Sequence, residues 1–228
     1  MGDKKQKEAS QKRWKKILFV IAAVLFVVVM VVSSMGTQWI TGLAPIKAGD
    51  SVVLDYTIYD AAGTPLVTTS QQVYQKAYNN NRSVLYAKQL SLTANQSLKT
   101  AIYPLPVYIA ENGGSYQEFA LYNPEYNAIS SAVVGMRAKD NKKVSLTSEL
   151  SMSKLFSAET LKNGNVNISS LQVGDILAMG VSESSNASAS NTSTSYIRLA
   201  EVTRISDEGA VIDFGYPYVD ITVSSFTS

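Results

Sequence analysis

The stretch SVVLDYTIY at residues 51–59 alternates apolar and polar side chains, and it is the segment that decides the fold. Every second residue from Val52 to Ile58 is apolar, and Asp55 and Thr57 lie between them. A period of two is typical of a strand that turns one face to a hydrophobic core. The body of the protein is therefore predicted to begin with a half-buried strand.

The segments that follow predict a mainly antiparallel β body. Residues 60–63 (DAAG) supply turn chemistry, so residues 64–69 are expected to return as the second strand of a hairpin. A short helix is predicted at 71–78, and residues 82–100 show only weak periodicity and are predicted to be irregular. Prolines on either side of Leu105 favour an edge position for the strand at 105–109, because proline cannot donate a ladder hydrogen bond. Further strands are predicted at 142–147, 176–181, 196–205 and 210–214, and around Ile221 and Val223.

One helix is predicted inside this body. Asn123-Pro124-Glu125 has a cap residue, a proline at the first helical position and an acid in the first turn. Apolar residues from Ala128 to Met136 then recur at helical spacing, so the helix is expected to pack one apolar face. After Ser151 the pattern predicts a second, small all-β unit, in which the Ser/Asn/Thr-rich residues 182–195 form a solvated loop.

A long apolar run lies near the N-terminus. Residues 17–35 are almost wholly apolar, and at about 1.5 Å per residue they span roughly 28 Å, the thickness of a bilayer core. Seven basic residues precede the run and only two acidic ones, so the positive-inside rule places residues 1–16 in the cytoplasm and the following residues outside. The alternative is a cleaved signal peptide, whose apolar region is usually shorter, about 7 to 15 residues. The length and the poor cleavage pattern at residues 34–36 favour an uncleaved, single-pass anchor in the cell membrane.

Composition excludes several functions. The chain has no cysteine and no histidine, which rules out disulfides, thiolate nucleophiles, a Ser-His-Asp triad and zinc held by Cys or His. Residues 17–228 hold 13 basic and 16 acidic residues, so nucleic-acid binding has no electrostatic support. No metal or cofactor is predicted. Five N-glycosylation sequons, a modest excess over chance, suggest a glycosylated outer surface; they begin at Asn81, Asn95, Asn167, Asn186 and Asn191.

Several motifs occur together in a recognisable order. They are GDSVVLDY (49–56), DAAG (60–63), YPLPV (103–107), AVVGM (132–136), NKKV (141–144), VGD (173–175), EVT (201–203) and GAVIDF (209–214). In this order and spacing the chain resembles the FKBP-type peptidyl-prolyl isomerases over residues 46–228. The later motifs resemble the long archaeal branch of that family, in which a small β domain is inserted in the flap near the active site.

The resemblance implies an α+β fold, an antiparallel half-barrel sheet wrapped on one short helix, with an apolar proline-binding pocket between them. It divides the chain into a cytoplasmic tail (1–16), an anchor (17–35), a spacer (36–45), an FKBP-like domain (46–150 and 214–228) and an inserted chaperone-like domain (151–213). Catalysis in this family is non-covalent and needs no cofactor. Removing the X-Pro amide from water and favouring its twisted form lowers the barrier without a nucleophile.

The resemblance also assigns substrate-binding positions, and no catalytic residue is assigned. Apolar or aromatic walls are expected from Tyr56, Leu66, Leu105, Ile129 and Val223. Val67 stands where the family has an acid, and Met152 where it has the flap tyrosine. The loop at 110–126 is longer than in the family, and Tyr126 is expected to take over its contacts. The same residues also alternate as ordinary core packing requires. The alternative that they form only a hydrophobic core, with no proline pocket, therefore stays open.

Two functions are consistent with these patterns. The first is an extracytoplasmic isomerase and folding helper that acts on unfolded or proline-containing exported polypeptides and is held in the lipid bilayer by residues 17–35. The second is an FKBP-fold binding module with little or no turnover, serving as a chaperone or as an accessory subunit of a membrane or surface complex. The replacement of two polar pocket residues, by Val67 and Met152, favours the second.

Overall fold

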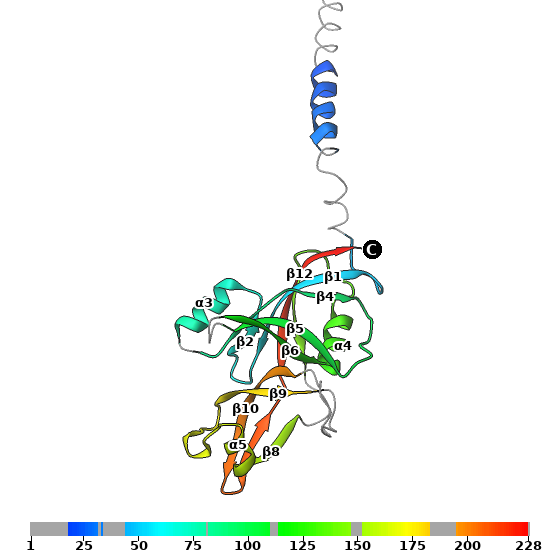
Figure 1. Cartoon of the computed structure of the whole chain (residues 1–228). Helices are drawn as coiled ribbons and strands as arrows, with labels where there is room; N and C mark the ends of the chain where they lie inside the picture. The colour runs from blue at the N-terminus through cyan, green and yellow to red at the C-terminus, as the bar shows by residue number, and fades with distance from the viewer. Residues whose placement is uncertain are drawn as a thin grey trace, which may run out of the picture. The chain divides into compact units, whose positions relative to one another are not determined.

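The computed structural model describes residues 18–31, 33, 44–80, 82–109, 114–146, 152–182 and 195–227. The chain forms two units, residues 1–44 and 45–228 (Figure 1). In the first unit, residues 18–31 are helical and their large hydrophobic side chains are exposed. Residues 1–17, 32 and 34–43 lie outside the described residues, and with them much of the predicted anchor and its flanks. Among the residues that are described, no helix combines the length and the apolar character needed to cross a membrane.

Strand β1 (Ser51–Tyr59) organises the second unit, because three strands pair with it. Strand β12 (Tyr218–Thr227) runs antiparallel to its whole length, and β2 (Pro65–Thr68) and β4 (Leu90–Thr93) share its other side. The predicted alternation is confirmed, since Val52, Leu54, Tyr56 and Ile58 are at most 3% exposed. The pairing with β12 shifts between Val53 and Leu54, and such a bulge bends a strand and helps the sheet to curl.

In the described part of the chain, twelve strands join into one sheet in the order β7-β12-β1-β2-β3-β5-β6-β10-β11-β8, with β4 paired to β1 and β9 to β10. The remaining strands are β3 (Leu85–Ala87), β5 (Ile102–Ile109), β6 (Ser115–Tyr122), β7 (Asn141–Ser145), β8 (Ser153–Ser157), β9 (Ile176–Val181), β10 (Tyr196–Ser206) and β11 (Gly209–Asp213). The fold is α+β, a curled half-barrel sheet with few helices (Figure 1).

Three α-helices belong to this unit within the described residues: α3 (Gln71–Asn79), α4 (Asn123–Ala132) and α5 (Ala158–Asn163). The predicted helices at 71–78 and from Asn123 are confirmed, but Asn123 is the first helical residue and not the cap. The cap is Tyr122, whose backbone N–H donates to the Glu125 carboxylate at 2.9 Å. The Asn123 amide instead donates to the Leu98 carbonyl at 2.7 Å and ties the preceding loop to the helix.

Two hydrophobic clusters form inside the unit. The larger lies between the curled sheet and α4, with side chains from β1 to β7 and from β12. The second lies between α5 and the strands β9, β10 and β11. Strand β10 serves both clusters, because Leu199 points into the larger and its neighbour Ala200 into the second.

Two predictions about the middle of the chain are wrong. Residues 82–100 contain the strands β3 and β4, which are too short to show a period but are held by strands far away in the sequence. Strand β5 is not at an edge, since it lies between β3 and β6. The prolines are tolerated because β3 ends at Ala87. The carbonyl of Pro106 accepts from the Lys88 N–H at 3.0 Å, just beyond the end of β3. The nitrogen and the carbonyl of one strand residue point to the same side, so the nitrogen of Pro106, which has no hydrogen to donate, also faces the space beyond that short strand.

Two further expectations need correction. The segment 110–126 is not simply a long loop, because β6 occupies residues 115–122 and forms a hairpin with β5. The unit expected to be all-β contains α5 and a short 3-10 helix, η2 (Ile168–Ser170). A local signal for α5 was present, since Ser157 caps it by accepting from the Thr160 N–H at 3.2 Å.

Candidate functional site

Seven of the eight predicted substrate-binding residues come together in the larger cluster. We call them the candidate site: Tyr56, Leu66, Val67, Leu105, Tyr126, Ile129 and Val223. They come from β1, β2, β5, α4 and β12, and each is at most 6% exposed. The eighth residue, Met152, precedes β8 and packs against the second cluster. The structure therefore brings seven of these residues into one buried cluster between sheet and helix and leaves Met152 outside it.

Strand register explains why these side chains meet. In the pairing of β1 with β12, Tyr56 lies opposite Ile221 and Leu54 opposite Val223. In the pairing of β1 with β2, Val67 lies opposite Ile58, which is two residues from Tyr56. Paired residues share a face of the sheet and so do residues two apart, so Tyr56, Val67 and Val223 all point inward.

Helix α4 supplies the opposite wall and is held by polar contacts on its back. Tyr126 and Ile129 are three residues apart and therefore lie on one face of the helix. The Ser130 hydroxyl donates to the Thr93 carbonyl at 2.9 Å and accepts from the Gln96 N–H at 2.9 Å. The Asn127 side chain accepts from the Leu98 N–H at 2.8 Å. These bonds fix the height and rotation of the helix over the sheet.

The Tyr56 hydroxyl is the unusual group of the candidate site. It is buried, and among the described residues it has no hydrogen-bond partner. Burial, and to a smaller extent Tyr103, raises the pKa of Tyr56, so its hydroxyl stays neutral. Val67, at the position where the family resemblance expects an acid, has an apolar side chain with no atom that can accept from it. Apart from the hydroxyls of Tyr56 and Tyr126, the side chains of the candidate site are apolar.

Tyr103 is a part of the site that the sequence reasoning missed. Its ring lies 5.0 Å from that of Tyr126, and its hydroxyl donates to the Ser91 carbonyl at 3.0 Å. Unlike the seven residues above, it is only half-buried. A signal was present in the sequence, because Tyr103 is two positions before Leu105 and so shares its face of β5.

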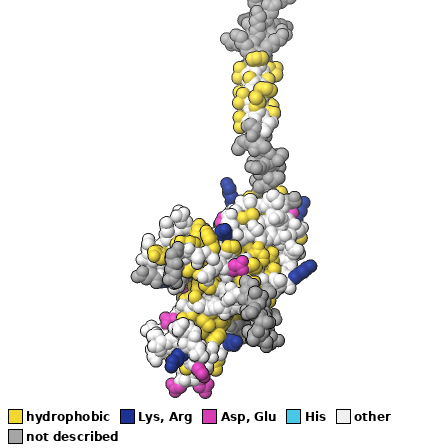
Figure 2. Space-filling model, in the orientation of Figure 1, with side chains coloured by type: hydrophobic (Ala, Val, Ile, Leu, Met, Phe, Trp, Pro, Cys, Tyr) yellow, Lys and Arg dark blue, Asp and Glu magenta, His cyan; other side chains and the backbone are white. Residues whose placement is uncertain are grey.

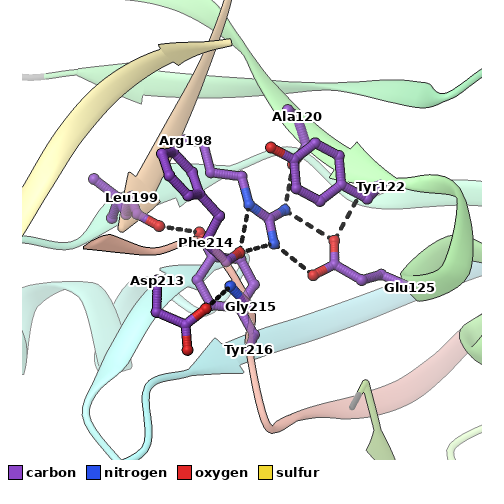
Figure 3. Close-up of polar contacts among 9 residues, drawn as sticks. All are labelled: Ala120, Tyr122, Glu125, Arg198, Leu199, Asp213, Phe214, Gly215 and Tyr216. Atoms are coloured by element: carbon purple, nitrogen blue, oxygen red, sulfur yellow. Dashed lines mark hydrogen bonds and ion pairs between the residues drawn. The ribbon is translucent and has the colours of Figure 1, made fainter. Parts of the chain in front are cut away.

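A buried ion pair links the second cluster to this site. Arg198 of β10 and Glu125 of α4 are 0% and 1% exposed, and Nη2 lies 2.5 Å from Oε1 while Nη1 donates to Oε2 at 2.8 Å (Figure 3). Nη1 also donates to the Ala120 carbonyl at 2.7 Å, and Nε donates to the Phe214 carbonyl at 2.9 Å. The guanidinium lies between the rings of Tyr122 and Tyr216, 4.0 and 4.1 Å from their centroids. We call this arrangement the junction.

Electrostatics at the junction favour the charged pair. Burial lowers the pKa of Arg198, but the adjacent Glu125 carboxylate and the nearby tyrosines raise it more, so the net pKa is above the ordinary value. Burial raises the pKa of Tyr216, an effect that Arg198 partly offsets, and the Tyr216 hydroxyl donates to the Leu199 carbonyl at 2.6 Å. Because Glu125 also accepts from the first turn of α4, the junction ties β10 to the helix that carries Tyr126 and Ile129.

Sequence reasoning missed the junction as well. It treated Glu125 only as a first-turn acid of the helix and did not single out Arg198. The available signal was an arginine in an otherwise apolar strand, because a buried cation needs a partner. The sequence did not show which carboxylate is the partner of Arg198, because Glu125 is 73 positions away.

Cavities lie elsewhere in the described structure. One of about 640 Å³ opens over α5 and η2, with Glu159 and Lys162 beside apolar Val166 and Ile168. One of about 310 Å³ lies between α3 and the β1–β2 turn. Among the described residues, no group of three or more His, Cys, Asp or Glu is placed to hold a metal ion.

The sequons fall on the surface where the structure describes them. Asn95 and Asn167 are exposed, and Asn167 also lines the cavity over α5. Asn81, Asn186 and Asn191 lie outside the described residues. Glycosylation therefore stays a prediction.

Comparisons with known proteins do not place the chain in a family. No protein-family model matches it, and no curated protein matches it.

Proposed function

We propose that this chain is a membrane-anchored, FKBP-like folding helper that binds proline-containing segments of exported polypeptides outside the cytoplasm. In this proposal residues 17–35 anchor the chain, residues 46–150 and 214–228 form the FKBP-like domain, and residues 151–213 form the inserted client-binding domain.

The observation that carries the proposal is the convergence of the candidate site. Seven residues chosen for their resemblance to a proline pocket lie between position 56 and position 223, and they meet in one cluster between sheet and helix. Tyr126 and Ile129 are on α4 itself, and the other five residues reach the same cluster from β1, β2, β5 and β12. Their chemistry suits the ring of proline, which is apolar and lacks an N–H donor.

The proposed mechanism uses binding alone. An X-Pro bond isomerises over tens of seconds without help, because the barrier is about 18 to 20 kcal/mol. An apolar wall that holds the proline ring and excludes water favours the twisted amide, which has lost its resonance and much of its polarity. No residue of the candidate site needs to gain or lose a proton in this process.

The junction supports a role for the second cluster in the same activity. The Arg198–Glu125 pair connects β10 with α4, so a polypeptide bound near the second cluster is held by an element that is directly tied to a wall of the candidate site. A client segment captured there is close to the proline site at a raised effective concentration.

A proline-peptide isomerisation assay tests the proposal. The full chain, purified in neutral detergent, is expected to speed the cis/trans relaxation of an Ala-Pro-Phe peptide above the spontaneous rate. Tyr103→Ala removes a half-buried ring at the rim and is expected to lower kcat/KM about tenfold. Tyr59→Ala is the matched control, since Tyr59 is a partly exposed tyrosine stacked on Tyr218 at 5.0 Å, away from the site. A folded chain that gives no acceleration removes the enzymatic part of the proposal.

The Tyr56 hydroxyl favours a second candidate, a binding module without turnover. This buried hydroxyl has no partner among the described residues, which is what remains when a pocket has lost its polar contact. This candidate predicts suppression of aggregation of a denatured client by a chain that is inactive in the peptide assay. An inactive chain that also fails to suppress aggregation contradicts both candidates.

The membrane part of the proposal has a separate test. Protease added to intact cells is expected to remove the body that follows residue 44 and to leave the N-terminal tail protected. If the body resists a dose that digests known external markers, the outward orientation is wrong.

A further inference from the structure

The proposed function does not use the smaller of the two cavities described above, the one beside α3. Its volume is about 310 Å³, and we call it the α3 cavity. Pockets that hold small molecules have volumes of roughly 300 to 1,000 Å³, so this one suits a small ligand. None of the described residues that line it belongs to the candidate site. Figure 2 shows hydrophobic side chains on the surface beside α3.

The α3 cavity has one wall from the start of β2 and one from the helix. Residues 63–65 form the first wall. Val73 and Ala77 line the second, and because they are four residues apart they share one face of α3. After the helix the Arg82 N–H donates to the Ala77 carbonyl at 3.1 Å, which turns the chain back toward the cavity. The walls are therefore apolar, and a basic side chain lies at their edge.

The Arg82 guanidinium is held by a residue of the opposite wall. Its Nη1 donates to the Thr64 hydroxyl at 2.8 Å, and both residues line the cavity. Because the Thr64 oxygen accepts this bond, its own O–H remains available to donate. Nε and Nη2 of Arg82 have no acceptor among the described residues. Such an edge of a guanidinium binds a carboxylate through two parallel hydrogen bonds.

Lys76 brings a second positive charge to the α3 cavity. It is in the last turn of α3 and lines the cavity. A cation in the last turn also stabilises a helix through the helix dipole, which accounts for Lys76 without a ligand. This does not account for Arg82, which lies beyond the helix and is bonded to Thr64. Within the described part of the chain, neither cation has a carboxylate at ion-pair distance.

Carboxylates do not neutralise these two charges. No Asp or Glu is among the described residues that line the α3 cavity. The acid closest to it in the sequence is Asp60, which is buried and accepts from the Thr64 N–H at 2.6 Å. Asp60 also raises the pKa of Glu201, so it lies near β10 rather than in the cavity. Figure 2 shows Asp and Glu side chains gathered away from α3, where β10 turns into β11.

We propose that the α3 cavity binds a small carboxylate that carries an apolar group. The carboxylate accepts from the free edge of Arg82 and from the Thr64 hydroxyl, and it pairs with Lys76. The apolar group packs against Val73 and Ala77. A free small acid and the carboxyl end of a polypeptide share this chemistry. Binding here depends neither on the candidate site nor on the membrane anchor, so it goes beyond the proposed function.

Fluorine NMR tests this proposal with the full chain in neutral detergent and empty micelles as the blank. The probe is 4-(trifluoromethyl)phenylacetate, whose line broadens on binding, with an expected Kd of about 1 mM or lower. Lys76→Gln/Arg82→Gln is expected to weaken binding about tenfold or more. Lys88→Gln/Lys154→Gln is the matched control, because it removes two cations that lie over aromatic rings outside the cavity. It is expected to bind within about twofold of the unchanged chain.

Further probes decide the ligand class. The amide, 4-(trifluoromethyl)phenylacetamide, is expected to bind about tenfold more weakly than the acid, and equal binding overturns the proposal. Binding of inorganic phosphate without binding of the acid also overturns it.

The source of the carboxylate follows from competition. Displacement of the probe by acetyl-Ala-Ala-Leu with a free carboxyl end, but not by its amidated form, supports the proposal and assigns the site to polypeptide ends. Displacement by 4-methylpentanoate alone supports it and assigns the site to small acids. No displacement by either acid overturns it. Isomerase activity of Lys76→Gln/Arg82→Gln is expected to stay unchanged, so failure here is separate from failure of the candidate site.

Discussion

The candidate site and the junction each bury a polar group, and they treat it in opposite ways. At the junction, the Arg198 guanidinium has carboxylate and carbonyl acceptors on several sides and aromatic rings above and below. In the candidate site, the Tyr56 hydroxyl has no partner within the described residues. A buried polar group without a partner costs about 1 to 3 kcal/mol, so a core kept only for stability favours the first arrangement. The difference is that the junction satisfies its buried polar groups, whereas the candidate site leaves one hydroxyl unsatisfied within the described residues.

The largest expected effect comes from breaking the junction. Arg198→Met is expected to lower the free energy of unfolding by about 3 to 5 kcal/mol, because Glu125 stays buried without its cation. Urea unfolding followed by circular dichroism measures it. The double variant Arg198→Met/Glu125→Gln is expected to recover part of the loss. If the single variant loses less than about 1 kcal/mol, the pair does not hold the two clusters together.

A smaller loss is expected from Tyr216→Phe. This change removes the hydrogen bond to the Leu199 carbonyl, which is 2.6 Å long and buried. The expected cost is about 1 to 2 kcal/mol, since the carbonyl loses its donor while the ring still packs. The same unfolding experiment measures it, and an unchanged midpoint shows that the bond contributes nothing.

The same substitution at Tyr56 is expected to have the opposite sign. Tyr56→Phe removes a hydroxyl that has no partner among the described residues, so the free energy of unfolding is expected to rise by up to about 1 kcal/mol. Together the two tyrosine variants test the comparison directly. Destabilisation by Tyr56→Phe as large as that by Tyr216→Phe contradicts the idea that the two regions differ.

The smallest effect concerns a carboxylate on β10. Burial, then Asp60, then Asp213 raises the pKa of Glu201, which lies opposite Asp213 of β11. A raised pKa means that the folded chain binds the proton more tightly than the unfolded chain. Stability is therefore lost as the pH rises from the ordinary glutamate range through the raised value.

Glu201→Gln removes this loss. At pH 7 it is expected to stabilise the chain by a few tenths of a kcal/mol, about 0.3, because solvent screens much of the repulsion. Thermal melts of both chains between pH 3 and pH 7 measure the difference, which is expected to vanish at the acidic end. A gain that persists undiminished at pH 3 has another cause.

Much of the fold was readable from local pattern. The alternation from Val52 to Ile58 predicted β1, the sequence around Asn123 predicted α4, and the segment Ile176–Val181 was predicted to the residue. Eight substrate-binding residues were predicted through the family resemblance, and seven of them are in one cluster. Periodicity succeeds here because residues two apart in a strand, and three or four apart in a helix, share a face whatever the order of the strands in the sheet.

Local pattern failed where distant strands decide the structure. The strands β3 and β4 are three and four residues long, too short to show a period, and they exist because β5 and β1 pair with them. Strand β5 is interior despite its prolines because its neighbour β3 ends before them. Met152 was placed in the proline pocket by resemblance, but it packs in the second cluster.

The sequence by itself determined which side of each long strand faces a core, where the helix over the candidate site begins, and that chemistry depending on Cys or His is excluded. Only the tertiary structure decided that Arg198 meets Glu125, that the Tyr56 hydroxyl has no partner among the described residues, and that tyrosines from α3, β3, β5 and β6 lie side by side. The reason is physical. Which face a side chain takes follows from backbone geometry within a few residues, whereas the partner of a buried group depends on the register and order of strands that are far apart along the chain.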